Sequence, residues 1–114
     1  MTNKVYEIIN ANIAMEKLIS QQDKYNIAIA YKIYKLKKNL DEVENFIMDR
    51  LVMILGENYD LNNLDENEKI IYQSLMMSDI DFDNCDLTMK EITNSDSITI
   101  TVNDIEKISK IVEK

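Results

Sequence analysis

Residues 24–55 read KYNIAIAYKIYKLKKNLDEVENFIMDRLVMIL, and no other part of the chain has a stronger structural signal. Apolar side chains recur here at helical steps, at Ile29, Ile33, Leu36, Leu40, Val43, Ile47 and Ile54. Such spacing places one apolar stripe along a long helix. Further apolar residues widen the stripe, namely Ile27, Phe46, Leu51, Val52 and Leu55. A wide stripe favours packing in a globular core, or against another helix of the same chain, over an isolated two-stranded coiled coil.

Two residues near the end of this segment have special roles. Arg50 occupies the one polar position of the apolar series, so it needs a carboxylate partner if it is buried. Glu42, Asp49 or an acid nearer the C-terminus could provide that partner. Gly56 is the single glycine of the chain, and it predicts a left-handed C-cap that ends the helix.

The chain before the long helix predicts one shorter helix. Residues 10–20 have helical periodicity, with Ile9 and Ile13 on one face and Leu18 and Ile19 as candidates to continue it. Residues 3–9 alternate only weakly, so they fit either a short strand or the first turns of a helix.

Two more helices are predicted after the long one. Asp65 and Glu68 form a capping box for the first of them. Its buried face is predicted to contain Ile70, Ile71, Leu75 and Met76. Thr101 is predicted to cap a closing helix. The buried face of that helix is predicted to contain Ile105, Ile108 and Val112.

Between these helices the pattern changes to that of strands. Residues 79–82 alternate acidic with apolar side chains, and Leu87, Met89 and Ile92 continue the alternation. Residues 94–97 have turn chemistry, and residues 98–102 have high β propensity. The sequence therefore predicts one α+β domain over residues 1–114, predominantly helical. In it a long central helix packs on two shorter helices, and a small C-terminal β-hairpin precedes a closing helix.

Length and composition limit the class of protein. The chain has 114 residues, no proline and one cysteine, Cys85, which cannot form an intrachain disulfide. The longest apolar run, residues 51–55, is far shorter than a signal peptide core of roughly 7–15 residues or a membrane span of about 20. We therefore expect a soluble, cytoplasmic protein with no membrane partner.

Missing residue types restrict the chemistry. The chain has no histidine, which excludes Ser-His-Asp and Cys-His nucleophile systems and the common zinc sites. One glycine excludes the glycine-rich phosphate-binding loops. We therefore expect no enzymatic activity, no metal and no cofactor.

The strongest candidate site is a cluster of aspartates at Asp79, Asp81, Asp83 and Asp86. Asp-x-Asp-x-Asp opens a calcium loop of the EF-hand kind, but Asn84 and Lys90 stand where that loop needs glycine and glutamate. A strand with aspartates on one face explains the pattern without a metal. The same row of carboxylates could bind a basic groove on another protein, or imitate the phosphates of nucleic acid.

Charge is unevenly distributed along the chain. Residues 1–40 hold seven lysines and three acids, a net charge of +4, whereas residues 41–114 have a net charge of −12. Lysines alternate with Tyr25, Tyr31 and Tyr34 in the basic part, a combination that can bind nucleic acid. The overall charge of −8 opposes this, so we expect a solvated helix face and no direct nucleic-acid binding.

Residues 30–35, Ala-Tyr-Lys-Ile-Tyr-Lys, begin a long helix that reaches Arg50, and Asn10 lies in the short segment before it. Together with the acidic alternation at 79–82 and the Thr-capped final helix, this arrangement resembles a family of small phage and prophage proteins, a domain of unknown function. The resemblance implies a phage origin and a non-enzymatic accessory role in the host cell. It implies no site residues.

Two functions follow as expectations. The first is a phage-encoded protein that inhibits a host defence or regulatory complex through the acidic face of Asp79, Asp81, Asp83 and Asp86. The second is an accessory or assembly protein of the phage particle, such as a tail component. Self-association, including a homodimer, would use the apolar stripe at Ile33, Leu36, Leu40, Val43 and Ile47. Binding through carboxylates should weaken steeply with salt, and binding through the stripe should not.

Overall fold

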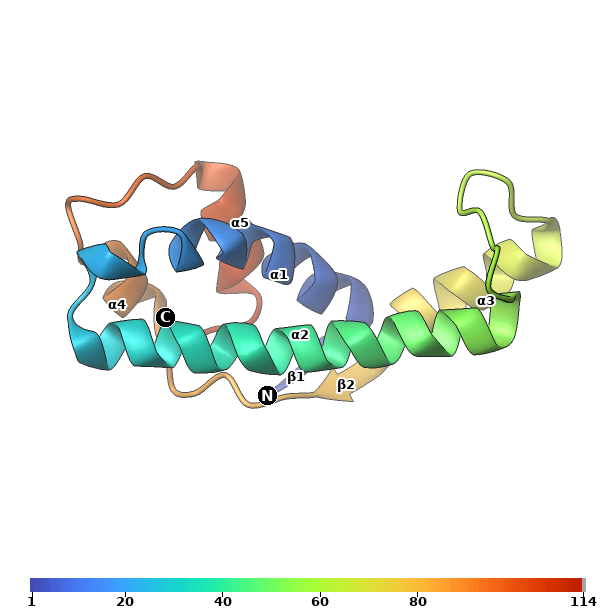
Figure 1. Ribbon diagram of the computed structural model, residues 1–114, viewed down its shortest axis with the longest axis horizontal. Helices are drawn as coiled ribbons and strands as arrows, with labels where there is room; N and C mark the ends of the chain where they lie inside the picture. Colours follow the sequence, from blue (N-terminus) through green and yellow to red (C-terminus); the bar gives the residue numbers. More distant parts are fainter. Residues whose placement is uncertain (114) are drawn as a thin grey trace.

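The computed structural model describes residues 1–113, which form an α+β fold dominated by helices (Figure 1). The elements in chain order are β1 (Thr2–Lys4), α1 (Val5–Ile19), a 3-10 turn η1 (Gln22–Lys24), α2 (Ile27–Leu55), α3 (Glu66–Met76), β2 (Asp79–Asp81), α4 (Met89–Thr93) and α5 (Val102–Ser109). The longest dimension is 47 Å, against 23 and 22 Å for the other two, because α2 runs the length of the molecule (Figure 1).

Helix α2 confirms the predicted long helix, with local chemistry that sets both ends. The Asn26 side chain accepts a hydrogen bond from the Ile29 amide at 2.9 Å, so the helix begins at Ile27 and not at residue 24. Gly56 ends the helix at φ 93° and ψ 161°. This positive φ explains the glycine, but the conformation is extended and not the left-handed helical cap that was predicted.

The main core lies between α1, the N-terminal half of α2 and α5. Ile33, Leu36 and Leu40 of α2 are fully buried there, and Ile8, Met15 and Leu18 of α1 pack against them. The stripe is narrower than predicted, because Ile27 and Phe46 are 86% and 57% exposed and Ile54 and Val52 are also exposed. Arg50 is exposed too, so it has no need of a buried carboxylate partner.

Helix α1 begins earlier than predicted. Residues 2–4 are a strand and the helix starts at Val5, so the weakly alternating segment contains both elements. Ile13, which was expected on one apolar face with Ile9, is 62% exposed. The buried residues of α1 include Leu18, as expected, and Ile13 lies outside this set, which is Val5, Ile8, Ala11, Asn12, Ala14, Met15 and Leu18.

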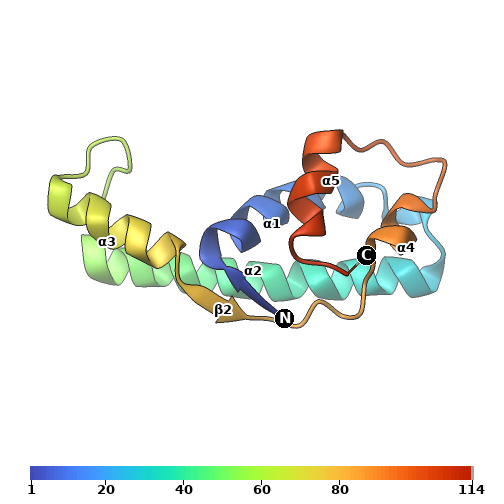
Figure 2. The ribbon, with the colours of Figure 1, turned by 180° about the vertical axis from the view of Figure 1, so that it is seen from behind.

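The C-terminal half of α2 and the whole of α3 form a helical hairpin that projects from the main core (Figures 1 and 2). Asp65 and Glu68 form the predicted capping box at the start of α3. A small second core holds Ile47 and Leu51 with Val5. Helix α3 contributes partly buried side chains to it, and Ile70 is 64% exposed, contrary to the prediction.

The prediction of a C-terminal β-hairpin was wrong. Strand β2 pairs instead with β1, antiparallel, with Asn3 opposite Ile80. Residues 98–101 form no strand in the described part of the chain, and Thr101 caps α5 as predicted. The alternation predicted after residue 82 also ends early. Cys85 and Asp86 take positive φ angles in a tight turn, after which Thr88 caps the short helix α4.

None of the helices in residues 1–113 combines the length and the apolar character needed to cross a membrane.

Candidate protein-binding groove

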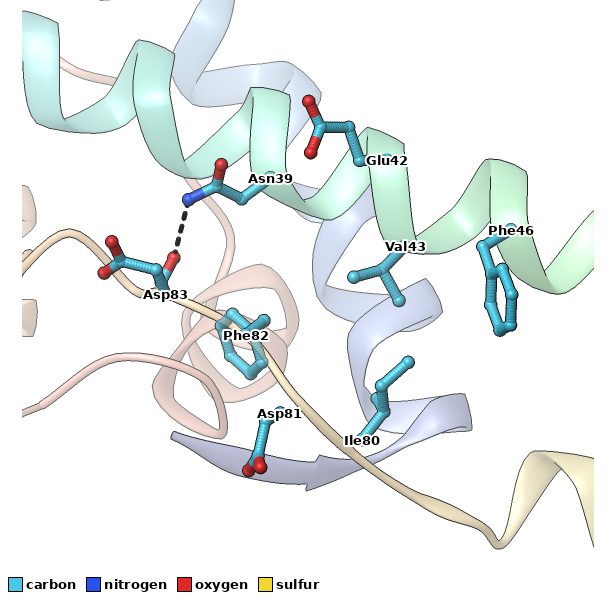
Figure 3. Close-up of a pocket in the computed structure, with 8 residues that line it drawn as sticks. All are labelled: Asn39, Glu42, Val43, Phe46, Ile80, Asp81, Phe82 and Asp83. Atoms are coloured by element: carbon cyan, nitrogen blue, oxygen red, sulfur yellow. Dashed lines mark hydrogen bonds between the residues drawn. The ribbon is translucent and has the colours of Figure 1, made fainter.

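A groove of about 380 Å³ separates helix α2 from strand β2 (Figure 3). Helix α2 contributes Asn39, Glu42, Val43 and Phe46, whose spacing of three, four and seven residues puts them on one face. The other wall is the extended segment 80–83. The two walls meet because Ile80 points toward Val43 of α2 (Figure 3), and both side chains pack against the main core, which includes Phe82.

The floor of the groove is apolar. Phe82 is buried, and Val43 and Ile80 are half-buried, so their remaining surface faces the opening. Phe46 stands at the rim with 57% of its surface exposed. Aromatic side chains are enriched at protein interfaces, so an exposed ring beside an apolar floor is a candidate anchor for a partner.

The rim of the groove is acidic. Glu42, Asp81 and Asp83 are exposed, and no basic side chain is found among the described residues that line the groove. One end is closed by Asn39, whose Nδ2 donates a hydrogen bond to the backbone oxygen of Asp83 at 2.9 Å. The Asp83 carboxylate accepts from the Cys85 amide at 2.8 Å, which fixes its position at that end.

The four predicted aspartates are all exposed, but they do not form one continuous face. Asp79 forms an ion pair with Lys4 at 2.8 Å, and Asp81 accepts a hydrogen bond from the Thr2 hydroxyl. Only Asp81 and Asp83 line the groove. Asp86 lies beyond it, in the tight turn. The strand interpretation of this segment is confirmed over residues 79–81.

The proposed self-association stripe is occupied by the chain's own core. Ile33, Leu36, Leu40 and Ile47 are at most 2% exposed, and Val43 is half-buried. These side chains therefore have almost no surface for a second copy while the protein keeps this fold.

A polar cluster joins α1 to α2 behind the groove. Asn12 is 2% exposed, and its Nδ2 donates to Asp41 at 3.0 Å and to Glu44 at 2.8 Å. Lys37 donates to the Asn12 oxygen at 3.0 Å and pairs with Asp41 and Glu16. Burial alone would lower the pKa of Lys37, but the hydrogen bonds to Asp41 and Glu16 outweigh it and raise the pKa. The cluster therefore stays ionised and fixes the helices together.

The basic segment of α2 is partly neutralised by acids from other elements. Lys32 pairs with Glu91 of α4 at 3.0 Å. Tyr31 and Tyr34 stack with ring centroids 6.3 Å apart, and Lys35 lies over the Tyr31 ring. These contacts are those of a solvated helix face.

The sequence indicated Asp81 and Asp83 but not the α2 wall of the groove. Glu42 and Phe46 share one helix face with Asn39, yet that face has meaning only once β2 lies beside it. In residues 1–113, no cluster of three or more His, Cys, Asp or Glu side chains has the spacing of a metal site.

Comparison with protein-family models, with curated proteins and with solved structures gives no match.

Proposed function

We propose that this chain is a non-enzymatic protein-binding module and that the groove between α2 and β2 is its contact surface. The observation that carries the proposal is the combination of an apolar floor, the exposed Phe46 ring and an acidic rim. Interfaces commonly have such an apolar centre surrounded by polar groups. The partner segment should be basic, because the rim carboxylates attract positive charge and repel phosphate.

The finer proposal is that the protein is phage-encoded and inhibits a host defence or regulatory complex. Small size, the net charge of −8 and the resemblance to small phage proteins support it. In this role the groove would bind a basic segment that the host complex needs for its own assembly or for binding nucleic acid.

A second candidate is an accessory or assembly role in the phage particle. The helical hairpin favours this alternative, because Met53 is 80% exposed and Ile70 64% exposed. Ile54 and Ile70 also line a shallow groove between α2 and α3 that contains Arg50. A particle component would bind through this apolar surface with little dependence on salt.

The test is a pull-down from host lysate with tagged protein, followed by titration of the identified partner in purified form. The groove variant combines Glu42→Lys, Asp81→Lys and Asp83→Lys. A matched control makes the same charge change at exposed acids outside the groove, with Glu57→Lys, Asp96→Lys and Glu106→Lys.

The proposal predicts that the groove variant binds the partner at least tenfold more weakly, and that the control binds like the wild type. Wild-type affinity should also fall as salt rises. Equal affinity of the groove variant and the wild type would contradict the choice of surface. A partner that binds independently of salt, and is lost on Met53→Lys and Ile70→Lys, would favour the assembly role.

A further inference from the structure

Strand β2 has one paired edge and one unpaired edge. In the part of the chain that the structure describes, the sheet has two strands, so β1 is the only strand beside β2. An unpaired edge presents a row of backbone N–H and C=O groups to which another chain can add.

The hydrogen-bond pattern shows which residues of β2 have groups on the unpaired edge. Phe82 donates its amide hydrogen to Met1 at 3.0 Å, and the Ser78 oxygen accepts from Val5 at 2.9 Å. Antiparallel pairs alternate between bonded and non-bonded residues. The backbone N–H and C=O groups of residues 78, 80 and 82 therefore point toward β1, and those of Asp79 and Asp81 point to the unpaired edge.

The unpaired edge faces the groove. The backbone oxygen of Asp83 follows the same alternation as Asp79 and Asp81, and it accepts a hydrogen bond from Asn39 of α2 (Figure 3). Asp81 and Asp83 also line the groove. Asp79 and Asp81 are exposed residues, and in the described part of the chain no hydrogen bond to their backbone N–H or C=O groups is found, so the edge is free between the Asn39 contact and the start of β2.

We propose that the groove binds an extended, basic segment of the partner protein, which adds to β2 as a third strand. This inference rests on the proposed function and specifies its binding mode. Backbone hydrogen bonds to Asp81 in the groove, and to Asp79 just beyond its end, would supply register, and side chains on one face of the added strand would pack on Val43 and Phe46. Lysine or arginine on that strand would meet the rim carboxylates.

The dimensions agree with a short added strand. From Asn39 to Phe46 the helix rises about 10 Å, at about 1.5 Å per residue. An extended chain advances about 3.3 Å per residue, so the groove is about three residues long. A second copy of β2 is a poor occupant, because its aspartates would lie against Asp79, Asp81 and Asp83.

The probe is a capped peptide of alternating lysine and valine, seven residues long, titrated into isotope-labelled protein and followed by backbone amide NMR shifts. Two matched peptides have the same sequence and charge but carry N-methyl groups on all valines or on all lysines. Each removes the amide hydrogens along one edge of the added strand.

We expect the unmodified peptide to shift the amides of Asp79, Asp81 and Phe46. One of the two N-methylated peptides should bind at least tenfold more weakly. Asp81→Pro removes one N–H of the unpaired edge but none that pairs with β1, and a proline is tolerated there. It should bind the unmodified peptide at least fivefold more weakly than Asp81→Ala, which loses the same rim carboxylate but keeps the N–H, with the β1 amide shifts retained. Phe46→Ala, at an exposed position, should weaken it without any effect on the sheet.

Equal binding of all three peptides would overturn strand addition and leave the acidic groove as a binding surface. No shift at millimolar peptide would also overturn strand addition, whereas the proposed function is decided separately by the groove and control variants against the purified partner. If Asp81→Pro disrupts the sheet, the N-methylated peptides decide the question on the wild-type protein.

Discussion

Replacing Asn12 with alanine should lower the free energy of unfolding by about 2–3 kcal/mol, because this residue joins α1 to α2. Helix α1 carries β1 at its start, and β1 in turn holds β2 beside the groove. The stability of the Asn12 contacts therefore bears directly on the position of the site.

The magnitude follows from the three hydrogen bonds of the Asn12 side chain. The bond from Lys37, whose side chain is 13% exposed, should contribute about 1.5 kcal/mol, as hydrogen bonds to buried charged groups do. The Asp41 side chain is 48% exposed and regains water when its partner is lost, as Glu44 does in part. These two bonds should therefore contribute only about 0.5 kcal/mol each.

The assay is urea unfolding followed by circular dichroism, with Asn45→Ala as the control. Asn45 is an exposed residue of α2, so the control has the same gain in helix propensity and loses no buried contact. The free energy of unfolding should fall for Asn12→Ala, and for Asn45→Ala it should stay within about 0.5 kcal/mol of the wild-type value. A loss below about 0.5 kcal/mol for Asn12→Ala would refute the reasoning, since it would mean that the buried cluster contributes nothing net.

Three further predictions concern single residues. The hydrogen bond from Lys17, and then that from Thr101, hold the pKa of Asp104 below its ordinary value. Because the pKa is lowered in the folded state, this stabilisation is present above the ordinary aspartate pKa of about 3.9 and is lost as the pH falls through the lower folded-state pKa. Asp104→Asn should therefore flatten the acid end of a plot of stability against pH, and an unchanged plot would contradict the assignment. Burial raises the pKa of the Cys85 thiol, so alkylation by iodoacetamide at pH 8 should be slower than that of glutathione; a faster rate would show a thiolate instead. Gly56→Ala should cost about 1 kcal/mol in urea unfolding, because φ is 93° although nothing lies within 4 Å of an added Cβ; no loss would mean that the turn relaxes freely.

Helices α1, α2, α3 and α5 could be predicted because their signals are local, whereas α4 lies where a strand alternation was predicted. The stripe of α2 and the caps at Asp65 and Thr101 depend only on residues close together in the sequence, and all three features are present in the structure. The width of the apolar stripe on α2 was predicted less well. Periodicity alone did not show that Phe46 lies outside the core, because that depends on which elements pack along α2.

Strand β2 was predicted, but its pairing with β1 could not be predicted, for a different reason. Strand β1 is only three residues long, its weak alternation fits a helix as well as a strand, and its partner lies far along the chain. Residues 98–102 have a stronger β propensity but find no strand to pair with, and Val102 begins α5. Pairing decides whether a segment becomes a strand, and propensity only permits it.

The candidate site was half predictable. Charge alternation marked Asp81 and Asp83, but it marked Asp79 and Asp86 equally, and these two lie outside the groove. Glu42 and Asn39 carried no signal in the sequence, because their role arises from the position of β2 beside α2.

The most direct test of the account is the binding footprint of the identified partner on the labelled protein, measured as amide shifts and as protection from hydrogen exchange. The account predicts that the affected residues cluster at 39–46 and 79–83, with the strongest protection at Asp79 and Asp81. A footprint confined to the hairpin around Met53 and Ile70, with the groove unchanged, would contradict it.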